Sequence, residues 1–384
     1  MKHFSEIPTL LQAREQQHLL RRRVELQSPQ SVQPIINGRQ MLSFCSNDYL
    51  GLANHPAIAD SMKAAIDACG VGSGASHLID GHHQYHEALE RDLAAFCGRE
   101  AALVFSTGYM ANMGVMAALM NRQDTIIQDK LNHASLIDGA KLAQAKMLRY
   151  RHNDTGHLAQ LLTQATGKRL VVTDGVFSMD GDCAPMTDLA RVAGEHDAWV
   201  MVDDAHGFGV LGEQGAGLVS EQGLSSSDVQ LVVGTLGKAF GTSGAFVAGD
   251  QSTIDYLLQF ARTYIYTTAT PPAVAAATRT SLGLVKQADT QRAHLQALIA
   301  RLRTGLTDID LPPMASRTPI QPVVIGSNER AMRISQHLNE RGLLVTAIRP
   351  PTVPEGTARL RITLSATHSF AQIDTLLNAL EDSR

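Results

Sequence analysis

Cysteine is scarce in this sequence, and its few cysteines are scattered. The 384 residues include 4 cysteines, and no two of them form a C-x-x-C pair. Structural zinc sites and disulfide-stapled folds depend on closely spaced cysteines, so neither is predicted. The spacing favours free thiols in a reducing environment, and we expect a cytoplasmic protein. The four positions are Cys45, Cys69, Cys97 and Cys183.

A large charge of one sign and a long apolar run are also missing. The formal net charge is −4, whereas nucleic-acid-binding proteins usually carry a strong basic excess. No apolar run reaches the roughly 18 residues of a membrane span, and residues 1–20 lack the basic-then-apolar order of a secretion signal. The sequence therefore predicts that the partners are neither nucleic acid nor membrane.

The composition is that of a globular protein with a large core. Hydrophobic residues make up 44% of the chain and charged residues 18%, and this length allows two domains. We expect an N-terminal helix and arm in residues 1–45, a large domain in 46–280 and a small C-terminal domain in 281–384. A helix is predicted for residues 5–23, with Ile7, Leu10, Leu11, His18 and Leu19 on one face.

Short apolar runs alternate with helix-length amphipathic segments between residues 101 and 249. Helices are predicted at 109–120, 134–145 and 187–196. This alternation predicts a mostly parallel seven-stranded sheet with helices on both faces. The predicted strands are 102–105, 125–128, 147–150, 170–173, 199–202, 229–233 and 245–248.

The pattern changes after Pro271-Pro272. Long helices are predicted within residues 273–306. Strands are then expected at 320–325, 343–347 and 359–364, followed by a closing helix at 370–381. The C-terminal part therefore reads as a smaller α+β domain.

One lysine stands out because of its surroundings. Lys238 follows an apolar, β-branched run and lies among glycines, in the segment Val233-Gly-Thr-Leu-Gly-Lys-Ala-Phe-Gly241. Glycine permits unusual backbone angles and close approach to a ligand, and Gly237 and Gly241 would leave the lysine room to move. Burial at a strand end should lower the pKa of the amine and make it nucleophilic. We interpret Lys238 as a covalent anchor.

Two other interpretations of this segment were weighed. A surface turn with an ordinary lysine fits the segment taken alone. A phosphate-binding P-loop requires glycine five positions before the Gly-Lys pair and Ser or Thr after the lysine. Val232 and Ala239 occupy those positions, so the P-loop is rejected.

Polar residues follow several predicted strands, where ligands of such sheets collect. A covalently held pyridoxal phosphate needs a lysine, a carboxylate at its pyridine nitrogen, a stacking ring and helix-start amides for its phosphate. Asp203 can supply the carboxylate, His206 can contact the phenolic oxygen and His133 can stack on the ring. The segment Ser106-Thr-Gly-Tyr109 opens a predicted helix. Together with Lys238 these residues predict a pyridoxal-phosphate site.

The histidines near residue 80 offer a second candidate site. His82 and His86 have the spacing of metal ligands on a helix, but no third ligand lies at a diagnostic distance in the sequence. We therefore predict no metal, and expect a helix at 85–96 that simply exposes its histidines.

Three consecutive arginines, Arg21 to Arg23, leave two interpretations open. Cations at a helix end complement the helix dipole and are commonly just a solvated face. Alternatively, they form an anion site for a substrate carboxylate or phosphate.

The sequence resembles the α-oxoamine synthase family of fold-type I pyridoxal-phosphate enzymes over nearly its whole length, most closely its biotin-pathway branch. The motif at residues 349–354 is the most discriminating for the biotin-pathway branch. The motifs are 46–52 (SNDYLGL), 72–76 (GSGAS), 129–135, 173–182 (TDGVFSMDGD), 202–207 (VDDAHG), 235–241 and 349–354 (RPPTVP).

The resemblance implies roles for individual residues. Lys238 would bind the cofactor covalently and carry the substrate proton, with Asp203, His206 and His133 in the roles given above. The cofactor site would be completed by Gly108, Tyr109, Ser178 and Thr235, and the substrates would be bound by Arg21, Asn47, His133, Arg349 and Thr352.

The resemblance also implies a reaction: decarboxylative condensation of L-alanine with a pimeloyl thioester, releasing CO2 and a free thiol. A homodimer with active sites at the interface is implied too, with Ser106 or Thr268 crossing between subunits. Two alternatives remain open. One is a sister enzyme that uses glycine, and the other is a non-catalytic partner subunit, which the presence of Lys238 disfavours.

Overall fold

A computed structural model describes residues 4–17, 19–21 and 23–383 of the chain. The chain divides into two compact units. The larger comprises residues 47–178 and 182–294, and the smaller comprises 1–46, 179–181 and 295–384. The division into 1–45, 46–280 and 281–384 made from the sequence stays a prediction.

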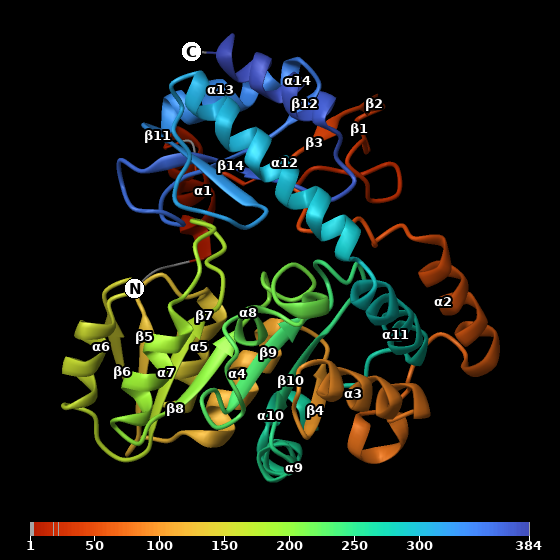
Figure 1. Cartoon of the computed structure of the whole chain (residues 1–384), viewed down its shortest axis with the longest axis vertical. Coiled ribbons are helices and arrows are strands. Elements are labelled where there is room, and N and C mark those ends of the chain that lie inside the picture. Colours follow the sequence, from red (N-terminus) through yellow and green to blue (C-terminus); the bar gives the residue numbers. More distant parts are fainter. Residues whose placement is uncertain (1–3, 18, 22, 384) are drawn as a thin grey trace. The chain divides into compact units, whose positions relative to one another are not determined.

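The larger unit is built on a seven-stranded sheet with the strand order β4-β10-β9-β8-β7-β5-β6 (Figure 1). Only β10 runs antiparallel to its neighbours; the pairs among β9, β8, β7, β5 and β6 are parallel. All seven predicted strands and the mostly parallel sheet are therefore confirmed. The strands are β4 (Ala101–Phe105), β5 (Thr125–Asp129), β6 (Lys146–Tyr150), β7 (Arg169–Asp174), β8 (Trp199–Asp203), β9 (Leu231–Thr235) and β10 (Ala245–Gly249).

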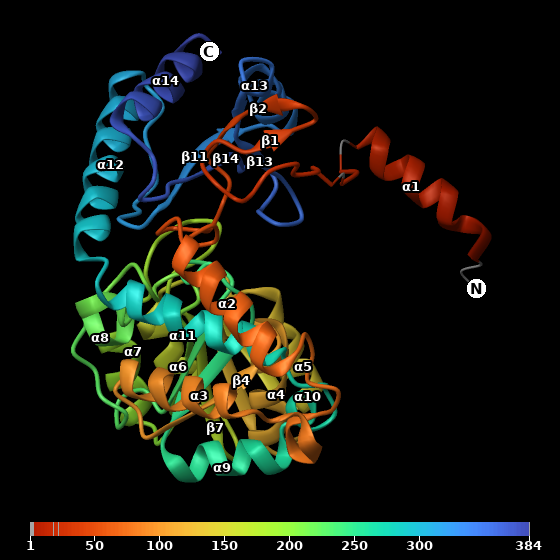
Figure 2. The same ribbon diagram turned by 90° about the vertical axis from the view of Figure 1, so that its right-hand side faces the viewer.

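Helices cover both faces of this sheet, as Figures 1 and 2 show. One face carries α4 (Gly108–Leu119), α5 (Ala134–Ala143), α9 (Gln251–Phe260) and α10 (Arg262–Ile265). The other carries α3 (Gln84–Phe96), α6 (Thr155–Leu162) and α7 (Met186–Gly194), with α11 (Pro272–Lys286) packed against α3 and α2 (Pro56–Cys69) packed against α11.

The central strands read as continuous apolar runs because both of their faces are buried. Leu170 and Val172 of β7 pack on the α4–α5 side, and Val171 between them points to the opposite face and is equally buried. Successive side chains of a strand alternate between the two faces of the sheet. In a strand that is covered on both faces, both sets of side chains are buried and therefore mostly apolar. The core therefore leaves only the strand ends for chemistry.

The smaller unit contains a three-stranded antiparallel sheet, β11-β14-β13. Its strands are β11 (Ile320–Gly326), β13 (Thr346–Ile348) and β14 (Ala358–Thr363), and its helices include α13 (Asn328–Glu340) and α14 (Phe370–Glu381). The hairpin β1 (Ile35–Ile36) and β2 (Arg39–Gln40) and the parallel pair β3 (Leu42–Ser43) and β12 (Leu343–Leu344) complete it.

One prediction for the C-terminal part needs correction in detail. The strand expected at 343–347 is two short strands in different sheets, β12 and β13. The long helices expected within 273–306 are confirmed as α11 and α12 (Asp289–Asp308), and the boundary between the units falls within α12.

The helix predicted for residues 5–23 is wrong in its second half. After the short 3-10 turn Phe4–Glu6, α1 (Ile7–Gln16) ends at Gln16, and Arg21 and Arg23 are not helical. None of the residues of α1 is buried, so no packing stabilises an extension toward three mutually repelling arginines. His18 and Arg22 lie outside the described residues.

The expectation that α3 exposes its histidines is also wrong. His86 is fully buried. Its Nδ1 accepts the backbone N–H of His83 at 3.0 Å, and its Nε2 lies 2.7 Å from the carbonyl oxygen of Thr270. The imidazole thus caps α3 and links its start to the segment before α11.

No helix in the described part of the chain is long and apolar enough to span a membrane.

Candidate active site

The polar residues predicted from the sequence meet at one edge of the large sheet. Asp174 pairs with Asp203 across β7 and β8, and Asp203 pairs with Val233 across β8 and β9, so these strands end at nearly the same level. A cavity of about 90 Å³ opens there. Its lining includes Gly108, Tyr109, His133, Ser135, Asp174, Ser178, Asp203, Ala205, His206, Thr235 and Lys238.

Lys238 lies in the compact loop between β9 and β10. The backbone N–H of Gly241 donates to the carbonyl of Lys238 at 2.8 Å, and that of Thr242 donates to the carbonyl of Leu236 at 2.9 Å. These bonds fix the backbone, while the half-buried side chain reaches into the cavity. Its Nζ lies 2.8 Å from Nε2 of His206.

The two glycines beside Lys238 serve different purposes. A Cβ on Gly237 would meet nothing closer than 3.7 Å, consistent with the expected room for the lysine. Gly241 has a φ of +65°, and a Cβ there would lie 2.4 Å from the backbone nitrogen of Ala53. Gly241 is therefore needed for backbone packing, and not for space around Lys238.

His206 is held by a tyrosine that the sequence reasoning did not assign. The hydroxyl of Tyr49 lies 2.5 Å from Nδ1 of His206 and 3.3 Å from Oδ1 of Asn47. Tyr49 is fully buried. A partner at Nδ1 fixes the orientation of the imidazole, so Nε2 is presented to Lys238. The only sequence signal was the place of Tyr49 in the motif of residues 46–52.

The two consecutive aspartates after β8 have opposite environments. Asp203 lines the cavity, whereas Asp204 is fully buried and accepts the backbone N–H of Leu218 at 2.6 Å. Burial raises the pKa of Asp204 to about 8. Glycine is required around this carboxyl, because a Cβ on Gly207 would lie 2.0 Å from Oδ1 of Asp204. Asp203 is the member of the pair that can serve a ligand.

A buried amide supports Asp203. Nδ2 of Asn112, from α4, donates to Oδ2 of Asp203 at 2.6 Å and to Oγ of Ser135 at 2.9 Å. The hydroxyl of Ser135 lies 2.8 Å from Nδ1 of His133. One network therefore sets the positions of both the carboxylate and the imidazole. Asn112 had no distinguishing pattern in the sequence, since it lies within an ordinary helical stretch, and the signal for Ser135 was its place in the motif of residues 129–135.

The start of α4 forms the anion-binding side of the cavity. Thr107 is the N-cap, and its hydroxyl accepts the N–H of Met110. The first N–H groups of a helix have no partner within it, and the dipole makes this end positive. Gly108 is the first residue of the helix, and a Cβ there would be 4.0 Å from its nearest neighbour, so backbone and ligand can approach closely.

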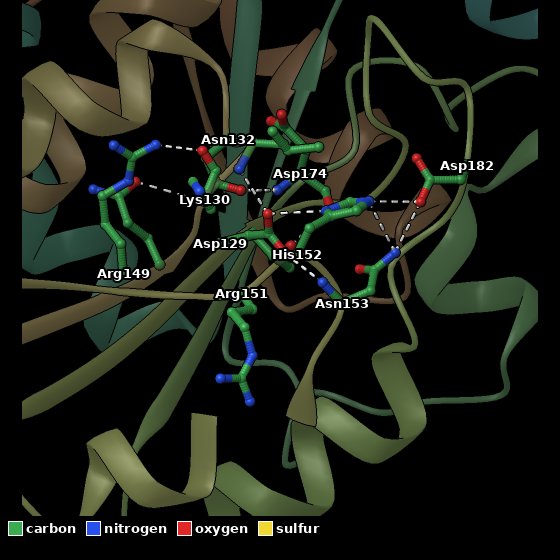
Figure 3. Close-up of polar contacts among 12 residues, drawn as sticks. Asp129, Lys130, Asn132, Arg149, Arg151, His152, Asn153, Asp174 and Asp182 are labelled. Atoms are coloured by element: carbon green, nitrogen blue, oxygen red, sulfur yellow. Dashed lines mark hydrogen bonds and ion pairs between the residues drawn. The ribbon is translucent and has the colours of Figure 1, made fainter. Parts of the chain in front are cut away.

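Ser178 lies in the loop between β7 and α7, which an ionic network anchors. Figure 3 shows three members of this network, Asp129, His152 and Asp182. His152 lies between two carboxylates, with Nδ1 3.0 Å from Oδ1 of Asp129 and Nε2 2.8 Å from Oδ2 of Asp182. Burial alone would lower the pKa of His152, but the two carboxylates raise it to about 10. The imidazolium thus holds the end of the Ser178 loop against β5 across the neutral pH range.

Asp174 supports the cavity floor. Its backbone N–H donates to Asn132 (Figure 3). Its Oδ2 accepts the backbone N–H of His133 at 2.9 Å. Burial and, next, the nearby charge of Asp203 raise the pKa of Asp174 well above its usual value. The carboxyl group of Asp174 thus holds the backbone of His133 at the edge of the cavity.

Three predicted substrate-binding residues belong to the smaller unit. Burial and then the positive charge of Arg21 lower the pKa of Arg349, so the two guanidinium groups act on each other. The backbone N–H of Thr352 donates to the carbonyl of Arg349 at 3.1 Å. Neighbouring cations of this kind can bind one anion together, and the anion-site interpretation of the arginine block stays a prediction.

The residues around the cavity fit pyridoxal phosphate. They supply an amine at Lys238, a carboxylate at Asp203, an imidazole at His133 and a helix start for a phosphate. The hydroxyls of Ser178 and Thr235 line the same space. The structure thus brings together in one cavity every predicted cofactor-binding residue.

Comparison with known proteins gives consistent results. Residues 39–380 match the family described as aminotransferase class I and II. The chain is 58% identical over 374 residues to an 8-amino-7-oxononanoate synthase of Marinobacter nauticus, covering 97% of this chain and 95% of that protein. It is 55% identical over 377 residues to one of Pseudomonas fluorescens, covering 98% and 96%.

Solved structures show the same fold. A serine palmitoyltransferase of Sphingomonas wittichii has a TM-score of 0.95 at 35% identity, covering 100% of this chain and 98% of that one. A serine palmitoyltransferase solved with its pyridoxal phosphate has a TM-score of 0.95 at 31% identity, with 100% and 98% coverage. An 8-amino-7-oxononanoate synthase of Francisella tularensis has a TM-score of 0.79 at 33% identity, with 89% and 97% coverage.

Proposed function

Because the chain belongs to the aminotransferase class I and II family, we propose that the cavity around Lys238 is the active site of a pyridoxal-phosphate-dependent acyltransferase. The chain catalyses the decarboxylative condensation of L-alanine with a pimeloyl thioester to 8-amino-7-oxononanoate, CO2 and free thiol, in biotin biosynthesis. The observation that carries this function is identity of 55–58% to enzymes of that activity over nearly the whole chain.

The residues at the cavity would hold the cofactor as follows. Lys238 is its covalent anchor, Asp203 keeps a proton on the pyridine nitrogen, and Nε2 of His206 donates to the phenolic oxygen. His133 stacks on the ring. The phosphate is bound at the start of α4 by Gly108 and Tyr109, with Ser178 and Thr235 completing the site.

When bound, pyridoxal phosphate stabilises negative charge at the α-carbon of an amino acid. The chain's own groups do the rest. Nζ of Lys238, once released from the cofactor, takes the proton from the α-carbon of alanine and later returns one. Arg349 binds the alanine carboxylate, with Asn47 nearby. Two hydrogen bonds from the guanidinium group hold that carboxylate in one orientation until CO2 leaves. Arg21 and Thr352 bind the acyl substrate.

A substrate comparison tests this function. The purified chain is supplied with pyridoxal phosphate and either pimeloyl-CoA or palmitoyl-CoA. Each mixture is given L-alanine, glycine or L-serine in turn, and CO2 and free thiol are measured. We expect turnover with alanine only, or far faster than with glycine. Faster turnover with glycine would indicate the sister activity, and turnover only with serine and palmitoyl-CoA would indicate a palmitoyltransferase; either contradicts the proposal.

We further propose that the chain is a homodimer, with Ser106 or Thr268 contributing to the partner's active site. Thr268 lies in a short antiparallel bridge with Ser76, which fixes its backbone. Sedimentation equilibrium of the pure enzyme should give twice the 41.3 kDa chain mass. A monomer with full activity would rule this out.

A further inference from the structure

A second group of ionisable side chains lies away from the active site, where α3 begins. His82, Glu87 and Glu90 converge there, with His77 behind them. They line a cavity of about 470 Å³, to which Arg91 and Glu100 and the ring of Tyr264 also contribute. No residue of this cavity lines the active-site cavity.

The three ligand atoms are spaced like those of a metal site. Nε2 of His82 lies 3.3 Å from Oε2 of Glu87 and 4.0 Å from Oε2 of Glu90, and all three atoms lie within 4.8 Å of one another. Ligand atoms at about 2.0–2.2 Å from zinc are roughly 3.3–3.5 Å apart in a tetrahedral site. Small rotations of the two carboxylates would therefore close the set around one ion.

His77 is placed to orient His82. Nδ1 of His77 lies 2.8 Å from Nδ1 of His82, and the His77 ring stacks on Tyr264 at 4.7 Å. A metal-binding histidine commonly donates its other ring N–H to an acceptor, which fixes its tautomer. With His77 as that acceptor, Nε2 of His82 presents its lone pair to the two glutamates. His86 lies nearby, but its Nδ1 caps α3 and its Nε2 is hydrogen-bonded to the carbonyl oxygen of Thr270.

The charges of the group also favour a cation. Glu90 is largely buried, and its Oε1 accepts the backbone N–H of Val104 at 2.8 Å. The group therefore offers one imidazole and two carboxyl groups as ligands for a cation.

We propose that His82, Glu87 and Glu90 form a binding site for a divalent cation of the zinc type, with His77 orienting His82 and water completing the coordination. Imidazole and carboxylate ligands suit such an ion. The sequence spacing of His82 and His86 lacked a third ligand, and the fold supplies Glu87 and Glu90 instead. The ion would join the turn His77–Gly81 to the first two turns of α3, a structural role separate from catalysis.

Calorimetric titration of the cofactor-loaded, chelator-treated enzyme with ZnCl2 tests the proposal. We expect one zinc per chain. Glu90→Gln and His82→Asn should each weaken binding by at least about 100-fold, and His77→Phe by about 10–100-fold, as measured for groups that orient metal ligands. The matched control is Glu100→Gln, in the same cavity, whose carboxylate accepts the backbone N–H of Gln251 at 2.9 Å. It should bind zinc within about twofold of the unchanged protein.

Thermal unfolding of every variant without metal shows whether it folds. Zinc should raise the midpoint of the unchanged enzyme and of Glu100→Gln, and leave that of Glu90→Gln unchanged. No saturable binding to the unchanged enzyme would overturn the proposal. Zinc binding by His82→Asn as tight as that of the unchanged enzyme would also overturn it, because the ion would then bind elsewhere. A loss of affinity in Glu100→Gln as large as that in Glu90→Gln would overturn it too, because the ion would then respond only to the negative charge of the cavity.

Discussion

Lys238→Ala should lower turnover of L-alanine and pimeloyl-CoA by at least about 10⁴-fold. In the proposed mechanism one amine performs two tasks, anchoring the cofactor and carrying the α-proton, and the proton transfer alone contributes roughly 10²–10⁴-fold. His206, at 2.8 Å from Nζ, is a poor replacement, because Tyr49 holds its Nδ1 and its Nε2 is proposed to contact the cofactor oxygen. CO2 release under saturating substrates measures the loss.

The matched control is Lys141→Ala. Lys141 is exposed on α5 and pairs with Asp138 at 3.1 Å, and an exposed ion pair of this kind contributes little to stability. Its turnover should stay within about twofold of the unchanged enzyme. A small primary amine added to Lys238→Ala should restore part of the proton transfer. Full activity of Lys238→Ala without added amine would disprove the role of this lysine.

Asp203→Asn should lower kcat by about 10²–10³-fold, a loss comparable to that caused by removing one preorganised charge-stabilising group from an active site. A neutral amide cannot keep a proton on the pyridine nitrogen. The fold should persist, because Asn112 can still donate to the remaining carbonyl oxygen in place of Oδ2, to which it donates at 2.6 Å. Steady-state kinetics with alanine and the absorption spectrum of the bound cofactor measure the effect.

The adjacent Asp204→Asn provides an internal comparison. Because burial raises the pKa of Asp204 to about 8, its carboxyl is mostly protonated at neutral pH, and an amide is a close substitute. We expect nearly unchanged kcat and, at most, a shifted unfolding midpoint. If Asp204→Asn lost kcat and Asp203→Asn kept it, the two assignments would have to be exchanged.

The sequence predicted most of the fold because the strands of the large sheet are buried on both faces. Such strands read as apolar runs wherever they occur, and the residue that follows each run is placed at the sheet edge by topology alone. This is why the sequence predicts that Asp203, Lys238 and the Ser106–Tyr109 segment lie together. The choice of Asp203 over Asp204 follows from strand alternation, which the structure shows directly.

The remaining features depend on tertiary contacts that have no local pattern. Asn112 and Tyr49 act through partners 91 and 157 residues away in the chain. Helix α1 ends at Gln16, and none of its residues is buried. The amphipathic spacing of the sequence could not show that its apolar face lacks a packing partner within the described chain. The turn at His77–Gly81 brings His77 and His82 to the glutamates of α3, and the sequence of this turn does not predict that these side chains converge.

The most direct test of the account is to identify the residue that carries the cofactor. The enzyme loaded with pyridoxal phosphate is reduced with borohydride, digested, and mapped by mass spectrometry. We predict that the cofactor mass is found on the peptide containing Lys238 and on no other lysine, and is absent from Lys238→Ala treated in the same way. Modification of a different lysine, with Lys238 unmodified, would contradict the assignment of this site.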